Sequence, residues 1–167
     1  MPAIQRLTPC LWFDQQAEEA ARFYVSIFQN SKIGNVARYT EAGQEIHGRP
    51  PGSAMTVAFQ LDGQEFLALN GGPVFKFNEA ISLVVNCDSQ AEVDFYWEKL
   101  SQGGDEQAQQ CGWLKDRYGV SWQVVPAAMG KLMSGSLPGG PQRATEAMLK
   151  MKKLDIGELR RAYVGKA

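Results

Sequence analysis

Histidine and cysteine are scarce in this sequence. Its 167 residues include one histidine, His47, and three cysteines, Cys10, Cys87 and Cys111. Three widely spaced cysteines cannot form a closed disulfide framework, and together with one histidine they lack the spacing of a structural zinc site. We therefore expect the cysteines to be small apolar core residues in a reducing compartment.

Long apolar runs and an excess of either charge are also missing. No stretch approaches the ~18 apolar residues of a membrane-spanning helix, and residues 1–6 lack the basic-then-apolar layout of a signal peptide. The 17 basic and 18 acidic residues leave a net charge of −1, whereas nucleic-acid binders usually carry a basic excess. We therefore expect a cytoplasmic protein that binds neither membrane nor nucleic acid.

The sequence contains an internal repeat. Residues 14–18 read Asp-Gln-Gln-Ala-Glu, and residues 88–92 read Asp-Ser-Gln-Ala-Glu. Each copy follows a strand-like apolar stretch, 7–13 in the first case and 80–85 in the second, and opens a segment with apolar residues at helical spacing. The repeat therefore predicts two related strand-then-helix units.

The repeated residues carry helix-start signals. Asp14 and Asp88, or the residue just after each, are candidate N-caps, because a side-chain oxygen can accept from the free N–H groups of a first turn. Glu18 and Glu92 would place negative charge near the positive helix end.

Three β-favouring segments are predicted after each helix. They are 33–40, 54–61 and 65–70 in the first half, and a polar strand ending near Cys111, 112–115 and 120–125 in the second. One helix cannot cover both faces of its own sheet. We therefore predict an α+β fold in which two βαβββ repeats, about 5–72 and 78–126, form a cupped mixed β-sheet with outer helices. Together they make one domain, 1–126, with a pocket between the repeats.

Residues 127–167 are predicted to be a connector followed by C-terminal amphipathic helices. Residues 143–167 carry seven basic and three acidic side chains. Such a tail could bind a membrane or nucleic acid. We instead expect its methionines and leucines to pack on this protein or on a second subunit, with its lysines and arginines in water.

The βαβββ repeat resembles the vicinal oxygen chelate (glyoxalase/bleomycin-resistance) superfamily. Within it, several stretches are similar to the PhnB-like group, which often carries the label 3-demethylubiquinone-9 3-methyltransferase. They are 8–14, Ala17 to Ala20 with Phe23-Tyr24, 66–72, 111–123 and 148–155. The resemblance covers nearly the whole chain and implies a two-fold homodimer.

The resemblance also implies a place for a metal site, on the first and last strands of each repeat. His or Glu ligands would be expected there, facing the concavity. This sequence has Pro9, Ala68 with Asn70, Ala80 with Ser82, and Gln123 at these places. Neutral amides are weak ligands for a transition metal, so we expect no metal and no cofactor.

What remains is a polar and aromatic surface that could bind a small molecule. Asn70 and Gln123 are the central candidates, because amides on inward faces need partners. Trp12, Phe75, Phe77, Trp113 and Trp122 could line the pocket or belong to the core, and Trp122 would pack under a helix if Gln123 faced inward. His47, in a loop, could close over the pocket mouth or be solvated. The predicted ligand-binding residues are Asn70, Gln123, Ser82, Trp12, Trp113 and His47.

Three functions are compatible with these residues and with the resemblance. The first is a small-molecule-binding protein without the ancestral metal site. The second is a metal-dependent lyase, isomerase or dioxygenase with rearranged ligands such as Glu45, His47 or Asp116. The third is the methyl transfer of the family label, although no glycine-rich cofactor turn follows a strand and opens a helix.

Overall fold

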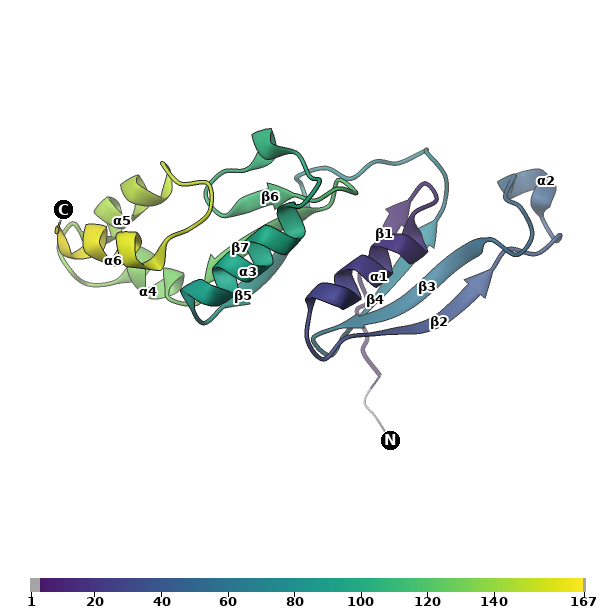
Figure 1. Cartoon of the computed structure of the whole chain (residues 1–167), viewed down its shortest axis with the longest axis horizontal. Helices are drawn as coiled ribbons and strands as arrows, with labels where there is room; N and C mark the ends of the chain where they lie inside the picture. The colour runs from purple at the N-terminus through teal and green to yellow at the C-terminus, as the bar shows by residue number, and fades with distance from the viewer. Residues whose placement is uncertain (1–3, 167) are drawn as a thin grey trace. The chain divides into compact units, whose positions relative to one another are not determined.

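The computed structural model describes residues 4–166, so residues 1–3 of the segment considered for a signal peptide lie outside it. The chain divides into two compact units, Met1–Phe77 and Asn78–Ala167 (Figure 1). No helix within residues 4–166 is long and apolar enough to cross a membrane.

The first unit is a four-stranded sheet with one helix along one face. Its elements are β1 (Cys10–Phe13), α1 (Ala17–Ile27), β2 (Lys32–Arg38), the single turn α2 (Gln44–His47), β3 (Ala54–Leu61) and β4 (Gln64–Asn70). The strand order is β1-β4-β3-β2, with β1 parallel to β4 and the other pairs antiparallel. This is the predicted βαβββ unit.

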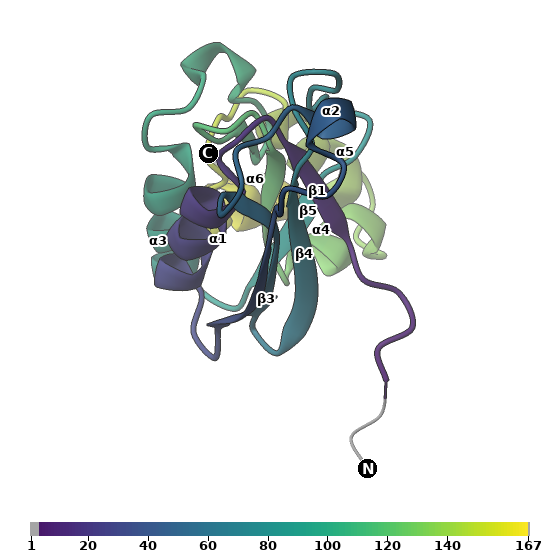
Figure 2. The same ribbon diagram turned by 90° about the vertical axis from the view of Figure 1, so that its right-hand side faces the viewer.

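Helix α1 lies along one face of the sheet of the first unit (Figure 2), and the core of this unit lies between them. Alanines at helical spacing and Tyr24 make the buried face of α1, which allows close approach to β3 and β4. Tyr24 stacks over Phe59, and Phe59 stacks on its cross-strand partner Phe66. Apolar burial at this interface is therefore what holds α1 in place.

The second unit repeats this plan with one strand fewer. It contains β5 (Leu83–Cys87), α3 (Gln90–Ser101), a 3₁₀ turn (Glu106–Ala108), β6 (Trp113–Lys115) and β7 (Ser121–Pro126). The order is β5-β7-β6, again with the first strand parallel to the last. The α+β fold class and the repeat are confirmed, while the joining of the two sheets into one cupped surface stays a prediction.

The prediction of a polar strand that ends near Cys111 is wrong. Residues 106–108 form the 3₁₀ turn instead, and only one isolated bridge, between Gln110 and Trp113, follows it. The segment 101–110 contains two glycines and no β-branched or aromatic residue, so nothing in it favours a strand. The side chain of Asp105 also accepts from the N–H of Gln107 and starts the turn.

The tail packs on its own chain, within the second unit. Its helices are α4 (Met129–Ser134), α5 (Gly140–Met148) and α6 (Ile156–Val164), drawn in green to yellow in Figure 1. Their shared core is made of Met129, Leu132, Ala144, Leu154 and Leu159. The backbone N–H groups of Cys111 and Gly112 donate to carbonyls of Met151 and Lys152, both at 2.8 Å, and so tie the tail to the start of β6.

Candidate functional site

The two candidate amides lie in different surroundings. Along β4, the side chains of Phe66, Ala68 and Asn70 are buried and share one face, because strand residues alternate. Phe66 stacks on Phe59 beneath Tyr24, so this is the face covered by α1. The expectation that Ala68 and Asn70 point to the helix-free face is therefore wrong.

Asn70 connects four segments of the first unit. Its side-chain Oδ1 accepts from the backbone N–H of Ala17 at 2.8 Å, and its Nδ2 donates to the carbonyl of Ala54 at 3.0 Å. Its own carbonyl accepts from the hydroxyl of Tyr39 at 2.6 Å. Asn70 is 6% exposed, so these bonds replace water for a buried amide. It thus joins β4 to α1, to β3 and to the segment after β2.

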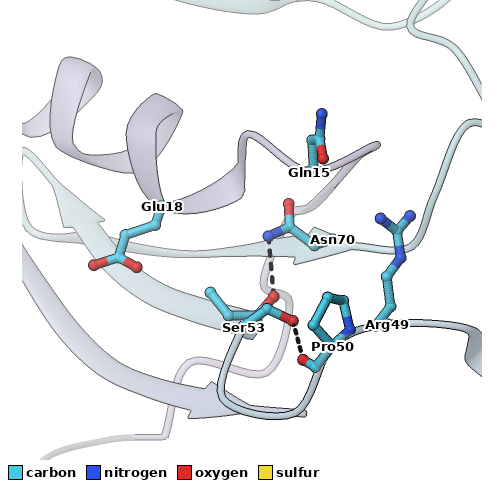
Figure 3. Close-up of a pocket in the computed structure, with 7 residues that line it drawn as sticks. Gln15, Glu18, Arg49, Pro50, Ser53 and Asn70 are labelled. Atoms are coloured by element: carbon cyan, nitrogen blue, oxygen red, sulfur yellow. Dashed lines mark hydrogen bonds between the residues drawn. The ribbon is translucent and has the colours of Figure 1, made fainter. Parts of the chain in front are cut away.

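A cavity of about 280 Å³ lies beside Asn70 (Figure 3). The start of α1 makes one wall, the end of β4 a second, and the loop that leads into β3 a third. The lining residues are Gln15, Glu18, Arg49, Pro50, Ser53, Ala54 and Asn70. In Figure 3, Glu18 and Arg49 lie at opposite ends of the cavity with Asn70 between them.

Arg49 is the one lysine or arginine in this lining. Its side chain is 19% exposed, and its Nη2 lies 3.2 Å from Oδ1 of Asp14. Nη2 also lies against Gly72, where a Cβ would come within 2.7 Å of it. Gly72 has a φ of +96°, a conformation that favours glycine. The glycine therefore leaves room for the guanidinium.

Glu18 is the one carboxylate in the lining, and its negative charge is already paired with two arginines. Arg22 reaches its Oε1 at 2.9 Å, and Arg38 reaches its Oε2 at 3.7 Å. The other polar side chains of the cavity, Gln15, Ser53 and Asn70, are neutral. The cavity therefore contains one cation and, at its opposite end, one carboxylate that already has two basic partners.

His47 organises the loop that carries Arg49. It ends α2, which refines the expectation of a loop residue. Its Nδ1 accepts from the backbone N–H of Arg49 at 3.0 Å, which places the ring proton on Nε2, 3.3 Å from the carbonyl of Ala42. The ring also packs on Tyr39, with centroids 4.5 Å apart. His47 does not line the cavity and instead holds the backbone of Arg49.

Three residues that line the cavity are absent from the ligand-binding residues predicted from the sequence: Arg49, Gln15 and Ser53. Arg49 lies in a loop, and a loop has no periodicity from which the direction of a side chain can be inferred. The available signal was the segment 48–52, Gly-Arg-Pro-Pro-Gly. Proline restricts the backbone and glycine permits turns, so an arginine between them is held in a defined place in the loop.

Three of the predicted ligand-binding residues, Gln123, Ser82 and Trp113, lie together in the second unit. Nε2 of Gln123 donates to the hydroxyl of Ser82 at 2.9 Å, and Trp113 is the register partner of Gln123 on β6. Trp122, the neighbour of Gln123, is 2% exposed and donates from Nε1 to Asp116 at 2.8 Å. Trp122 lies on the α3 side with its register partner Leu114, so Ser82, Trp113 and Gln123 share the opposite, helix-free face.

Ser121 lies on this helix-free face too. It sits two residues before Gln123 and is 2% exposed. Its Oγ has no hydrogen-bond partner within residues 4–166. A buried hydroxyl without a partner costs free energy and is rare in folded proteins.

Trp12 has a structural role in the first unit. Its Nε1 donates to the carbonyl of Gly72 at 2.9 Å, and Phe75 meets its ring edge-on at 4.9 Å. A Cβ at Gly71 would lie 2.1 Å from the indole. The glycine pair at 71–72 therefore accommodates both the ring of Trp12 and the guanidinium of Arg49.

Residues 4–166 contain no group of three His, Cys, Asp or Glu side chains placed to share a metal ion. Asp116, one of the suggested alternative ligands, is 3% exposed. Its Oδ1 accepts from the N–H groups of Tyr118 and Val120, and its Oδ2 accepts from Trp122. Both oxygens therefore hold the β6–β7 turn.

Comparison with known proteins identifies the family. A family model described as 3-demethylubiquinone-9 3-methyltransferase matches residues 5–125, which leaves α4–α6 outside the match. A putative 3-demethylubiquinone-9 3-methyltransferase, PhnB protein, from Bacillus cereus is 37% identical. The match covers 74% of this chain and 100% of that one, with a TM-score of 0.64.

Two further solved structures are more distant. A Pseudomonas aeruginosa protein is 20% identical over 74% of this chain and 98% of its own, with a TM-score of 0.56, and shares the fold. A glyoxylase/bleomycin resistance protein/dioxygenase domain from Frankia is 14% identical over 74% of this chain and 93% of its own, with a TM-score of 0.46. No curated protein matches this sequence. The chain belongs to the PhnB-like family described as 3-demethylubiquinone-9 3-methyltransferase.

Proposed function

We propose that this protein binds a small molecule in the cavity beside Asn70. The observation that carries the proposal is the position of Arg49, a cation whose side chain is only 19% exposed in a cavity of about 280 Å³. A cavity of this size is near the lower end of those that hold small ligands. Its walls are fixed by the hydrogen bonds of Asn70 and His47, so a ligand would enter a site that is already formed.

The methyl transfer named by the family label has no support in the local geometry. S-adenosylmethionine is usually held by a glycine-rich turn between a strand and a helix of a parallel sheet. Here the turn from β1 to α1 is Asp14-Gln15-Gln16, and the turn from β5 to α3 is Asp88-Ser89. Neither contains glycine, so the residues at these turns do not fit that cofactor.

The proposal can be tested by screening a fragment library with NMR on isotopically labelled protein. Binding in the cavity should shift the side-chain amide of Asn70 and the backbone amides of Ala17 and Ala54. Ser53→Phe should abolish these shifts, because it fills the cavity. Ser26→Phe, on the exposed side of α1, should leave them unchanged. A library in which no fragment moves these signals, or one whose shifts survive Ser53→Phe, would refute the proposal.

We further propose that the protein is a cytoplasmic homodimer. Three free cysteines support a reducing compartment. The first sheet has the exposed edge strand β2, and an uncovered strand edge can pair with a second copy of the chain. Sedimentation equilibrium should give about twice 18.4 kDa. A mass that stays at the monomer value across the concentration range would refute the dimer.

A further inference from the structure

The guanidinium of Arg49 has unused hydrogen-bonding capacity. A guanidinium carries five N–H donors in a planar fork. One nitrogen, Nη2, is bonded to Asp14, while Nε and Nη1 make no hydrogen bond within residues 4–166. An arginine that is mostly withdrawn from water and only partly paired can accept a further anionic partner.

The ion pair between Arg49 and its existing partner, Asp14, is weak. Asp14 contacts Arg49 through a single oxygen at 3.2 Å, and its side chain is 45% exposed, compared with 19% for Arg49. Exposed one-point ion pairs contribute little to stability. A carboxylate inside the cavity could instead meet two nitrogens of the fork at once, in the stronger bidentate geometry.

Arg49 is also held ready for such a partner. Its backbone N–H is bonded to His47, the rigid Pro50 follows it, and its guanidinium rests on Gly72. Less conformational entropy is lost when an already positioned side chain binds a ligand. The neutral groups of Gln15, Ser53 and Asn70 surround the space in front of it.

We propose that the ligand of this cavity is a small carboxylate, held by the guanidinium of Arg49, and that Asp14 takes its place when the cavity is empty. The inference rests on the proposed function and adds the chemical class of the ligand. A cationic ligand is disfavoured, because the only lining carboxylate, Glu18, already contacts Arg22 and Arg38. A neutral ligand would leave the fork of Arg49 without an anionic partner.

The test compares three probes of nearly equal shape: butyrate, butyramide and butylamine. NMR titration of the wild-type protein at millimolar concentrations should give saturable shifts of the Asn70 side-chain amide and the Arg49 Nε–H with butyrate alone. Arg49→Gln should abolish binding, and Arg49→Lys should weaken it about tenfold, because the bidentate fork is lost. Arg160→Gln, an exposed arginine on α6, is the matched control and should bind butyrate normally.

Asp14→Asn gives the sharpest test. It removes the internal competitor of the ligand and should tighten butyrate binding several-fold. Equal binding of butyramide, unchanged binding in Arg49→Gln, or weaker binding in Asp14→Asn would overturn the carboxylate assignment. If butyrate fails to bind while other fragments bind and are blocked by Ser53→Phe, only this assignment falls. If no fragment binds, the proposed function falls with it.

Discussion

The side-chain oxygen of Asn70 accepts a hydrogen bond from the backbone N–H of Ala17 at 2.8 Å, across 53 positions of sequence. The N-cap residue of α1, Gln16, makes no side-chain capping bond. The last residue of β4 therefore supplies the acceptor that a Ser, Thr or Asp would ordinarily supply locally. This bond fixes the start of α1, and with it one wall of the cavity.

Replacing Asn70 should cost stability, whatever it does to ligand binding. Asn70→Leu leaves the N–H of Ala17 and the carbonyl of Ala54 without their partner in a buried place, and we expect a loss of about 2–3 kcal/mol. Asn70→Asp keeps the acceptor and should lose less. Urea unfolding of both variants measures the difference. Equal losses in the two variants would show that the helix cap is not the main contribution.

The elements were predictable because their residue patterns repeat. The sequence motif at 14–18 and 88–92, and the apolar periodicity around it, identified both strand-then-helix units. The N-cap expected next to Asp88 is confirmed at Ser89, which accepts from the N–H of Glu92. Local signals of this kind are read from a few neighbouring residues.

The direction of Asn70 could not be predicted in the same way. Residues 66–69 of β4 are Phe-Leu-Ala-Leu, which are all apolar, so alternation does not show which set faces the helix. The face was assigned from the family resemblance, and the stacking of Phe66 on Phe59 reverses it. The cavity lies in contacts between a loop, a strand end and a helix start, which only the folded chain brings together.

The glycine at position 71 should be irreplaceable on steric grounds. A Cβ there would lie 2.1 Å from the indole of Trp12, so Gly71→Ala must displace the ring and its bond to Gly72. We expect a loss of about 2 kcal/mol or more in urea unfolding. Gly130→Ala is the matched control. It lies in α4 with open space around the added methyl group, and should gain up to about 1 kcal/mol.

Ser121 should be one of the few positions where removing a polar group stabilises the protein. Its buried Oγ has no partner within residues 4–166, so Ser121→Ala removes a desolvated hydroxyl and should raise stability by about 1 kcal/mol. Ser82→Ala should act in the opposite direction, because it deprives Gln123 of its acceptor. Thermal unfolding of both variants distinguishes them. A destabilised Ser121→Ala would mean that the hydroxyl is hydrogen-bonded in solution.

The cysteines should react in an order set by exposure and acidity. Cys87 is fully buried, and burial together with the nearby carboxylates of Glu92 and Asp88 raises the pKa of its thiol to about 11. At pH 8 only about one Cys87 in a thousand would be a thiolate. Cys10 is exposed. Alkylation of the folded protein, followed by peptide mass analysis, should label Cys10 first and Cys87 only after denaturation. Early labelling of Cys87 would contradict its burial.

Attachment of the tail to α3 should weaken in acid. Lys153 contacts Asp94 at 2.6 Å, and hydrogen bonds from Lys153 and then Gln90 lower the pKa of this carboxyl. A carboxyl whose pKa is lower in the folded state than in the unfolded state stabilises the fold at pH values above the unfolded pKa, near 3.9. This contribution is lost as pH falls through the folded pKa.

Because Asp94 is half-exposed, the contribution should stay below about 1 kcal/mol. Wild-type protein should therefore lose slightly more stability than Asp94→Asn between pH 5 and pH 3, as measured by urea unfolding. Since Gln90 also binds the backbone of Leu154 and Ile156, Gln90→Ala should speed hydrogen exchange at Ile156 even at neutral pH. Parallel pH profiles for the wild type and Asp94→Asn would show that the ion pair contributes nothing to the attachment.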